Sequence, residues 1–266
     1  GHPNKGKSSI VSTLAGDDSV EIKADPRTTI RCNRYPMKVD GITLYELIDT
    51  PGFQRARPAL AWMMERETTA AEHHRMVGEF VDTFRDTGEY PDETELLRPL
   101  VEGAGILYVV DGSVPYGPEY EAEMKILRWT GQPSMGLINP IGPADHIEEW
   151  RAALQQYFSV VRVFNAVRST FDKRIELLRA FGQLREEWRE VLNQAVDSLI
   201  EDRARRRGRA AGALAENLAG MLSHRIEVSL PESDADDADI QARQEARYFD
   251  ELRAMERKSR DRIEEI

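Results

Sequence analysis

The chain has 266 residues, of which 41% are hydrophobic, so it can bury one large core or two modest ones. Its net charge of −11 disfavours broad, sequence-independent nucleic-acid binding, because a phosphate backbone attracts a surplus of Lys and Arg. The single cysteine, Cys32, excludes an intrachain disulfide framework and suits a reducing compartment, so we expect a cytoplasmic protein.

The chain begins with a phosphate-binding loop, Gly1-His2-Pro3-Asn4-Lys5-Gly6-Lys7-Ser8-Ser9, which matches the pattern G-x-x-x-x-G-K-S. Such a loop surrounds a phosphate with backbone N–H groups and leads into the positive end of a helix. Lys7 is expected to reach the β- and γ-phosphates of a nucleoside triphosphate, and the Ser8 hydroxyl to ligate Mg²⁺. The nucleotide-binding residues predicted in this loop are Gly1, Asn4, Lys5, Gly6, Lys7, Ser8 and Ser9.

A loop of this kind normally follows a buried strand, whereas here Gly1 is the first residue. We therefore interpret the sequence as part of a longer protein, with the first strand of the sheet missing. The chain also ends inside a helical pattern, at Ile266, without a stop signal. The C-terminal helical region is thus expected to be incomplete.

Apolar runs that end in turn residues predict buried strands at 42–48, 105–110, 135–138 and 160–164. Helical patterns alternate with them at 10–14, about 60–84, 120–129, 147–158 and 175–184. This alternation predicts an α/β fold with a mainly parallel sheet flanked by helices on both faces. We expect this domain to span 1–184 and an α-helical region to span 185–266, with helices at 186–202 and 241–266 separated by a basic, small-residue stretch and an acidic loop at 231–237.

The strand at 42–48 is followed by Asp49-Thr50-Pro51-Gly52, which has the pattern D-x-x-G. Asp49 is expected to hold Mg²⁺ through a water, and the Gly52 N–H to sense the γ-phosphate. Between the two motifs, Thr28-Thr29 lies where a first switch belongs, and we favour Thr29 as a Mg²⁺ ligand. Alternatively, the two threonines begin an edge strand at Ile30.

These three motifs resemble the TrmE–Era–EngA group of bacterial P-loop GTPases. Further segments resemble an Era-related subgroup with a C-terminal domain of unknown function: Tyr108-Val109-Val110-Asp111, Glu121-Ala122-Glu123-Met124-Lys125-Ile126-Leu127, Gly131-Gln132-Pro133 and Leu137-Ile138-Asn139-Pro140. The resemblance covers residues 1–184 and implies a molecular switch that binds GTP and GDP and hydrolyses GTP with Mg²⁺.

Guanine is read in this group by N-K-x-D, whose Asp accepts two hydrogen bonds from the base. The corresponding segment here is Asn139-Pro140-Ile141-Gly142, so the Asn is kept and the Lys and Asp are lost. Preference for guanine over adenine is therefore open. Asp145 either reads the base instead or, as we favour, caps the following helix. On the base side, the predicted nucleotide-binding residues are Asn139, Asn165 and Ala166.

Phe53 occupies the position after Gly52 where Ras-like proteins carry a catalytic Gln, and an apolar side chain cannot orient water. We do not transfer the role to Gln54. The resemblance implies instead a K⁺ ion held by Asn4, often across a homodimer of the switch regions. Alternative donors of positive charge are Arg27, Arg55 and Arg57. The predicted catalytic residues are Lys7, Asn4 and Thr29; the predicted metal ligands are Ser8, Thr29 and Asp49 for Mg²⁺ and Asn4 for K⁺.

Three further features have two interpretations each. His73-His74 with Glu72 and Glu79 lacks the spacing of a zinc site, so we favour a polar helix face. The segment 62–100 is interpreted as an effector-facing insertion, with a core face of Trp62, Met63, Met64, Met76 and Phe80. A basic cluster precedes small apolar residues from Ala210 onward and either contacts an anionic membrane or, as we favour, belongs to a solvated helix: Arg203, Arg205, Arg206, Arg207 and Arg209.

The rival function is a nucleotide-binding interaction protein that does not hydrolyse GTP or discriminates weakly between bases. Its helical region would then serve assembly or membrane contact. Phe53 and Gly142 favour this rival, whereas Lys7, Ser8 and Asp49 favour the enzyme.

Overall fold

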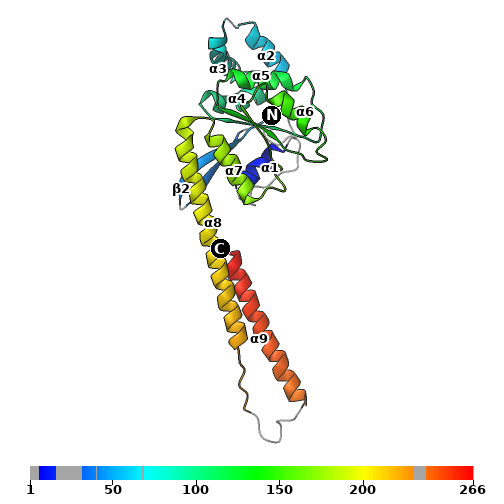
Figure 1. The fold of residues 1–266 in the computed structure, drawn as a ribbon, viewed down its shortest axis with the longest axis vertical. Helices are drawn as coiled ribbons and strands as arrows, with labels where there is room; N and C mark the ends of the chain where they lie inside the picture. Colours follow the sequence, from blue (N-terminus) through cyan, green and yellow to red (C-terminus); the bar gives the residue numbers. More distant parts are fainter. Residues whose placement is uncertain (1–5, 16–31, 40, 67–68, 230–237, 266) are drawn as a thin grey trace. The chain divides into compact units, whose positions relative to one another are not determined.

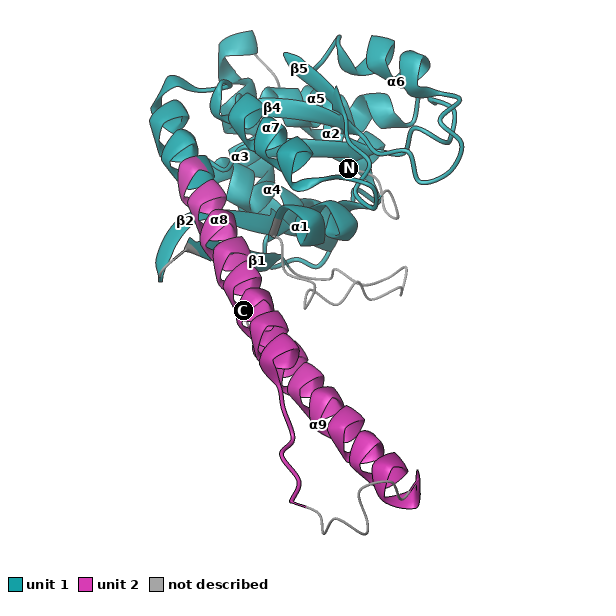
Figure 2. Ribbon diagram, turned by 60° about the horizontal axis from the view of Figure 1, so that its bottom comes forward, with its two compact units in different colours: residues 1–196 teal, residues 197–266 magenta. Residues whose placement is uncertain are grey.

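The computed structural model describes residues 6–15, 32–39, 41–66, 69–229 and 238–265. The chain divides into two compact units, residues 1–196 and 197–266, which are coloured separately in Figure 2 and are described here one at a time. The boundary expected at residue 184 stays a prediction.

The first unit contains a three-stranded parallel sheet with the order β3-β4-β5, formed by Ile106–Val110, Ser134–Ile138 and Val160–Val163. In register, Val110 lies opposite Ile138, and Ile138 opposite Val163. The carboxyl ends of the three strands are therefore level. The three predicted strands are confirmed: β3 and β4 are continuous apolar runs, typical of strands buried on both faces, whereas β5 contains the exposed Arg162 and Val163.

Helices cover both faces of this sheet (Figure 1). On β3, Tyr108 and Val110 belong to a core cluster with residues of α2 (Ala56–Met64), α3 (His73–Phe84), α4 (Pro91–Val101), α5 (Tyr120–Trp129) and α6 (Ile147–Leu154). The intervening Val109 belongs to a second cluster, with residues of α1 (Lys7–Ala15) and α7 (Phe171–Gly182). Alternate side chains of one strand thus enter opposite layers. The predicted α/β fold with a mainly parallel sheet is confirmed.

A two-stranded antiparallel sheet precedes it, in which β1 (Asn33–Val39) pairs with β2 (Ile42–Asp49). The connecting turn contains Gly41 at φ 80°. β2 was predicted, whereas a strand before it was only the alternative, as an edge strand from Ile30, a residue outside the described part of the chain; β1 begins at Asn33. Arg34, Pro36 and Lys38 make β1 too polar to resemble a buried strand, and Pro is tolerated in a strand only at an edge.

An apolar cavity of about 380 Å³ lies between β2 and β3, beside α1 and α7. Within the described residues, no strand ladder joins the antiparallel pair to the parallel sheet. Side chains that line the cavity include Ile10, Leu14, Leu47, Leu107, Val109 and Leu177.

The predicted helical stretch 60–84 is interrupted, with a 3₁₀ turn, η1 (Ala70–Glu72), between α2 and α3. Met63, Met76 and Phe80 are buried as expected, whereas the expectation for Met64 is wrong because 48% of it is exposed. α6 begins at Ile147, as predicted, and ends at Leu154 rather than at 158. α7 begins earlier than predicted because the Thr170 hydroxyl accepts a hydrogen bond from the Lys173 N–H and caps the helix.

The second unit consists of the later part of α8 (Glu186–Ser223) and of α9 (Ala238–Glu264). The predicted interruption after residue 202 is wrong, since the basic stretch continues α8; Arg and Ala are strong helix formers. His224 stacks on Tyr248, and Arg262 pairs with Glu216 at 2.7 Å. The earlier position, 216, thus pairs with the later one, 262, and the later position, 224, with the earlier one, 248. The two helices therefore run antiparallel and form a helical hairpin.

In the part of the chain that the structure describes, no helix combines the length and apolar character needed to cross a membrane.

Candidate functional site

The phosphate side of the site is at the start of α1. Gly6 precedes this helix with φ 78°, and a side chain there would collide with the Asn139 amide. Both the left-handed conformation and the close approach require glycine. Ile10 and Leu14 bury the inner face of α1 in the second core cluster. This packing places Lys7, the first helical residue, beside the carboxyl ends of the strands, the usual ligand-binding edge of a parallel sheet.

Ser8 and Asp49, two predicted Mg²⁺ ligands, lie together. The Ser8 hydroxyl donates a hydrogen bond of 2.8 Å to Asp49 Oδ2, although the residues are 41 positions apart. Asp49 ends β2 and is only 5% exposed. A hydroxyl and a carboxylate are the hard oxygen donors that Mg²⁺ prefers, so this pair fits the predicted ion.

The electrostatics of this pocket favour a charged guest. Burial lowers the pKa of Lys7, although attraction to Asp49 opposes the shift. Burial also raises the pKa of Asp49, opposed by the Ser8 hydrogen bond and by Lys7. For each of the two groups, the effect of burial on the pKa is thus larger than the opposing effect of its charged partner. A polyphosphate beside Lys7 and a cation beside Asp49 would stabilise both charged forms, and shifts of this kind are common at functional sites.

The base side consists of two loops that hold each other. Asn139, directly after β4, accepts a hydrogen bond of 3.1 Å from the Ala166 N–H through its side-chain oxygen. In return, the Asn165 amide donates to the Pro140 carbonyl at 3.0 Å. The Thr13 hydroxyl on α1 donates to the Ala166 carbonyl at 2.8 Å. The structure therefore brings the three predicted base-side residues together and ties them to the helix of the phosphate side.

Asp111 supports the same region, a role that the sequence analysis did not assign. It follows β3, is 7% exposed and accepts hydrogen bonds from the Ile141 N–H at 3.3 Å and the Ser113 N–H at 2.9 Å. In the sequence, Asp111 stands directly after a buried strand and ends the segment Tyr108-Val109-Val110-Asp111, but neither feature indicates these hydrogen bonds. Through Ile141, Asp111 fixes the segment that replaces N-K-x-D.

No carboxylate stands at position 142, because Gly142 is exposed beside Ser113. The interpretation of Asp145 as a helix cap is wrong, since His146 is the N-cap residue of α6 and Asp145 is exposed. The His146 side chain caps no backbone N–H of α6 and instead lies with Nδ1 3.1 Å from Glu149 Oε2. A role of Asp145 in reading the base stays a prediction.

The segment after Gly52 points into the protein. Gly52 is buried, and Phe53 is 1% exposed inside the larger core cluster. Phe53 is thus a core residue, and Gln54 beside it is exposed. Arg55 is exposed too, and its guanidinium donates a hydrogen bond to the Glu89 carbonyl at 2.9 Å.

Several predicted residues lie outside the described part of the chain: Gly1, Asn4, Lys5, Thr28, Thr29 and Arg27. Predictions for the K⁺ ligand and the first switch therefore stay predictions. Ser9 lies in the first turn of α1, and its carbonyl oxygen, like that of Ala166, lies 2.8 Å from the Thr13 hydroxyl, which has one hydrogen to share between them. Among the described residues, no three His, Cys, Asp or Glu side chains gather as a metal cluster. His73 instead stacks on Trp129.

Comparison with protein families decides the class of this site. A family profile described as a 50S ribosome-binding GTPase matches residues 1–139, slightly more than half of the chain. The chain belongs to this GTPase family. A second profile, described as a domain of unknown function (DUF3482), matches residues 151–266 and so begins within α6.

The curated relative that matches is the tRNA modification GTPase MnmE of Nitrosospira multiformis, which is 29% identical over 110 residues. These residues are 41% of this chain and 24% of MnmE, so the chain spans about a quarter of that relative's length. No solved structure matches. The comparisons support a P-loop GTPase with GTP binding and hydrolysis at the level of the family; the Era-related subgroup stays a prediction.

Proposed function

We propose that this chain is a Mg²⁺-dependent GTPase of the Era-related kind, which hydrolyses GTP to GDP and phosphate and acts as a molecular switch. The observation that carries the proposal is the Ser8–Asp49 hydrogen bond of 2.8 Å at the start of α1, beside Lys7. The hydroxyl, the carboxylate and the Lys7 charge that attracts Asp49 support the proposal, because phosphoryl transfer uses groups of these kinds.

Each residue has a distinct role in this proposal. Lys7 neutralises the β- and γ-phosphate oxygens, and the N–H groups at the start of α1 bind the phosphates. Ser8 and Asp49, with Thr29, hold the Mg²⁺ ion, which supplies positive charge against the phosphates. The Gly52 N–H contacts the γ-phosphate and loses that contact when phosphate leaves. Asn139, Asn165 and Ala166 hold the base.

The burial of Phe53, directly after Gly52, supports an ion-assisted mechanism. Phe53 is buried in the core, so its side chain takes no part in positioning water. We infer that Asn4 holds a K⁺ ion whose charge assists hydrolysis, in a homodimer formed through the switch regions.

The helical unit supports peripheral membrane contact of a cytoplasmic protein. Leu214, Leu218 and Leu222 recur every four residues on α8 and are 55%, 58% and 80% exposed. Residues at this spacing share one helix face, and Arg207, seven positions before Leu214, lies on the same face. Arg205 and Arg206 pair instead with Asp202. A basic and apolar face of this kind suits an anionic membrane surface.

The buried Phe53 and the missing carboxylate at Gly142 favour one second candidate, a nucleotide-binding interaction protein that does not turn over GTP.

Hydrolysis of GTP, measured with and without Mg²⁺, separates the two. We expect Mg²⁺-dependent turnover that falls about 100-fold in Asp49→Asn, because the cation loses a charged ligand. The matched control is Glu46→Gln, three positions earlier on β2, where the carboxylate pairs with Arg34 at the surface. Binding of Mg²⁺ and GTP without turnover would support the second candidate. Absence of binding would contradict both.

A further inference from the structure

The loop that follows Gly52 is anchored to α4 by a buried carboxylate. Glu93, in the first turn of α4, is 1% exposed. Its Oε1 accepts hydrogen bonds from the Gln54 N–H at 2.7 Å and from the Arg55 N–H at 2.5 Å. These N–H groups precede the first turn of α2, whose N-cap residue is Arg55. A carboxylate at the start of a helix accepts hydrogen bonds from N–H groups that have no partner within the helix. Its negative charge also interacts favourably with the positive end of the helix dipole.

The start of α2 in turn holds the start of α4. Arg55 Nη1 donates to the Glu89 carbonyl at 2.9 Å, and the guanidinium lies 4.6 Å from the centroid of the Tyr90 ring. Phe53 and Tyr90 belong to the same core cluster. The backbone from Phe53 to Arg55 is therefore fixed from both directions. Gly52 is the residue immediately before it, so its N–H can turn only as far as this anchor permits.

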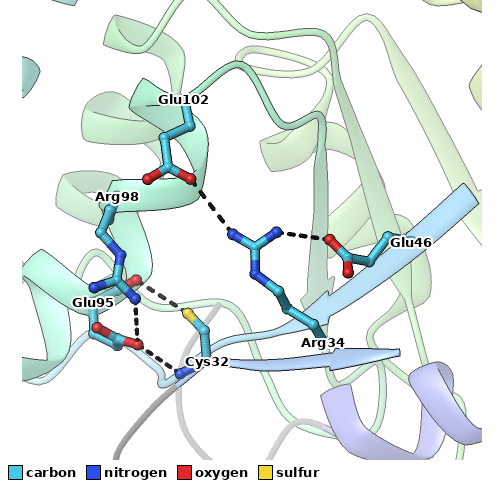
Figure 3. Close-up of polar contacts among 6 residues, drawn as sticks. All are labelled: Cys32, Arg34, Glu46, Glu95, Arg98 and Glu102. Atoms are coloured by element: carbon cyan, nitrogen blue, oxygen red, sulfur yellow. Dashed lines mark hydrogen bonds and ion pairs between the residues drawn. The ribbon is translucent and has the colours of Figure 1, made fainter. Parts of the chain in front are cut away.

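The same helix also holds the segment that follows the first switch. In Figure 3, Glu95 of α4 faces Cys32, whose N–H donates to Glu95 Oε1 at 2.8 Å. The Cys32 thiol donates to the Glu95 carbonyl at 3.1 Å, and Arg98 holds the Glu95 carboxylate at 2.9 Å. Cys32 stands three positions after Thr29 in the sequence. One turn further along, Glu102 pairs with Arg34 at 3.5 Å.

We propose that α4 braces two segments of the site, with Glu93 as a positioning residue for the loop that follows Gly52 and Glu95 as the residue that anchors the chain from Cys32 onward. Residues two apart on a helix point to nearly opposite sides, so one helix turn holds both segments at once. The inference rests on the proposed function, since it assigns the brace to the γ-phosphate contact of that site. Recognition of the triphosphate should then depend on α4 more than recognition of the diphosphate does.

The first test compares the affinities for a non-hydrolysable GTP analogue and for GDP in the whole protein with Mg²⁺. Glu93→Ala leaves two backbone donors without their acceptor, so we expect the ratio of the two affinities to fall about tenfold, with GDP affinity within about twofold of the wild type. Glu93→Gln keeps an acceptor oxygen and should restore most of the ratio. Asp92→Ala, which removes the neighbouring carboxylate in the same helix turn, is the matched control and should leave the ratio unchanged.

An equal fall in both affinities would show that Glu93 is only structural and would overturn the inference. An unchanged ratio in Glu93→Ala would overturn it as well. If the wild type binds neither nucleotide, the proposed function fails instead, and the brace itself is decided by the second test.

The second test uses Cys32, the only thiol of the chain, as a probe of its contact with α4. Burial, with the Glu95 charge and hydrogen bond, raises the pKa of Cys32 to about 12, and Arg98 and Arg34 oppose this shift. Because the thiolate is the reactive form, alkylation by iodoacetamide at pH 8 should be about a thousandfold slower than for an ordinary thiol. Glu95→Gln removes the charge that raises the pKa of Cys32, so it should accelerate alkylation about tenfold. Glu102 pairs with Arg34 instead, so Glu102→Gln should leave the rate unchanged. Alkylation of the wild type at the rate of an ordinary thiol would show that the brace does not form.

Discussion

The phosphate side and the base side of the site differ in what holds them together. Lys7, Ser8 and Asp49 converge through their own charged and polar groups, which are also the groups that the reaction needs. On the base side, Asn139 and Asn165 bind the backbone of each other's loop. That scaffold does not involve a carboxylate at position 142. The difference teaches that the two loops of the predicted base side hold each other through backbone contacts that do not depend on a carboxylate at position 142.

The largest effect should come from removing the charge on the phosphate side. Lys7→Ala deletes the ammonium group that faces the β- and γ-phosphates, and we expect affinity for GTP with Mg²⁺ to fall about 100-fold or more. Lys173→Ala, at the exposed start of α7, is a control for the lost positive charge. Calorimetric titration measures both. If Lys7→Ala bound GTP with wild-type affinity, the claim that the phosphate side depends on the charge of Lys7 would be contradicted.

Restoring a carboxylate at position 142 tests the base side. Gly142 has no positive φ, and a Cβ there would meet Ser113 at 3.4 Å, which is an ordinary contact. Gly142→Asp should therefore fold and return a carboxylate to the base, raising the preference for GTP over ATP by about tenfold or more. Competition between the two nucleotides measures this preference. If wild-type selectivity is already strong and Asp145→Ala removes it, Asp145 reads the base and the scaffold has not lost its reader.

A smaller effect, on rate, concerns the monovalent ion. Turnover should be about tenfold faster in K⁺ than in Na⁺ at equal ionic strength, because an ion beside the phosphates stabilises developing charge. Asn4→Ala should lower the K⁺ rate to the Na⁺ level without abolishing GTP binding. Equal rates in both salts, with Asn4→Ala neutral, would exclude this mechanism and direct attention to Arg27 or to an Arg from a partner.

Sequence patterns predicted the parts of the fold that depend on local order. The runs at 105–110 and 135–138 are continuous apolar segments, which gave β3 and β4 within one residue. The strand before β2 was expected only as an alternative, an edge strand from Ile30, because Arg34, Pro36 and Lys38 interrupt the continuous apolar runs by which the other strands were identified. The break expected in α8 was wrong because small and basic residues continue a helix as well as they end one.

The site was predictable as far as its motifs extend. Lys7, Ser8 and Asp49 belong to patterns with a fixed chemical meaning, and the structure brings them together. Glu93 belongs to no sequence motif, because the N–H groups from which it accepts hydrogen bonds lie 38 and 39 positions away. Asp111 supports a loop 30 positions away in the same manner. Long-range hydrogen bonds to backbone depend on the fold, so a local pattern carries no signal for them.

Titration of the protein with GTP and with ATP, each with Mg²⁺, tests the central comparison most directly. The account predicts that both bind, that GTP is favoured by no more than about tenfold, and that Lys7→Ala abolishes both. This result would show that the phosphate side provides most of the affinity for the nucleotide and that the base side distinguishes little between guanine and adenine. A preference for GTP of about a thousandfold, or binding that survives Lys7→Ala, would contradict it.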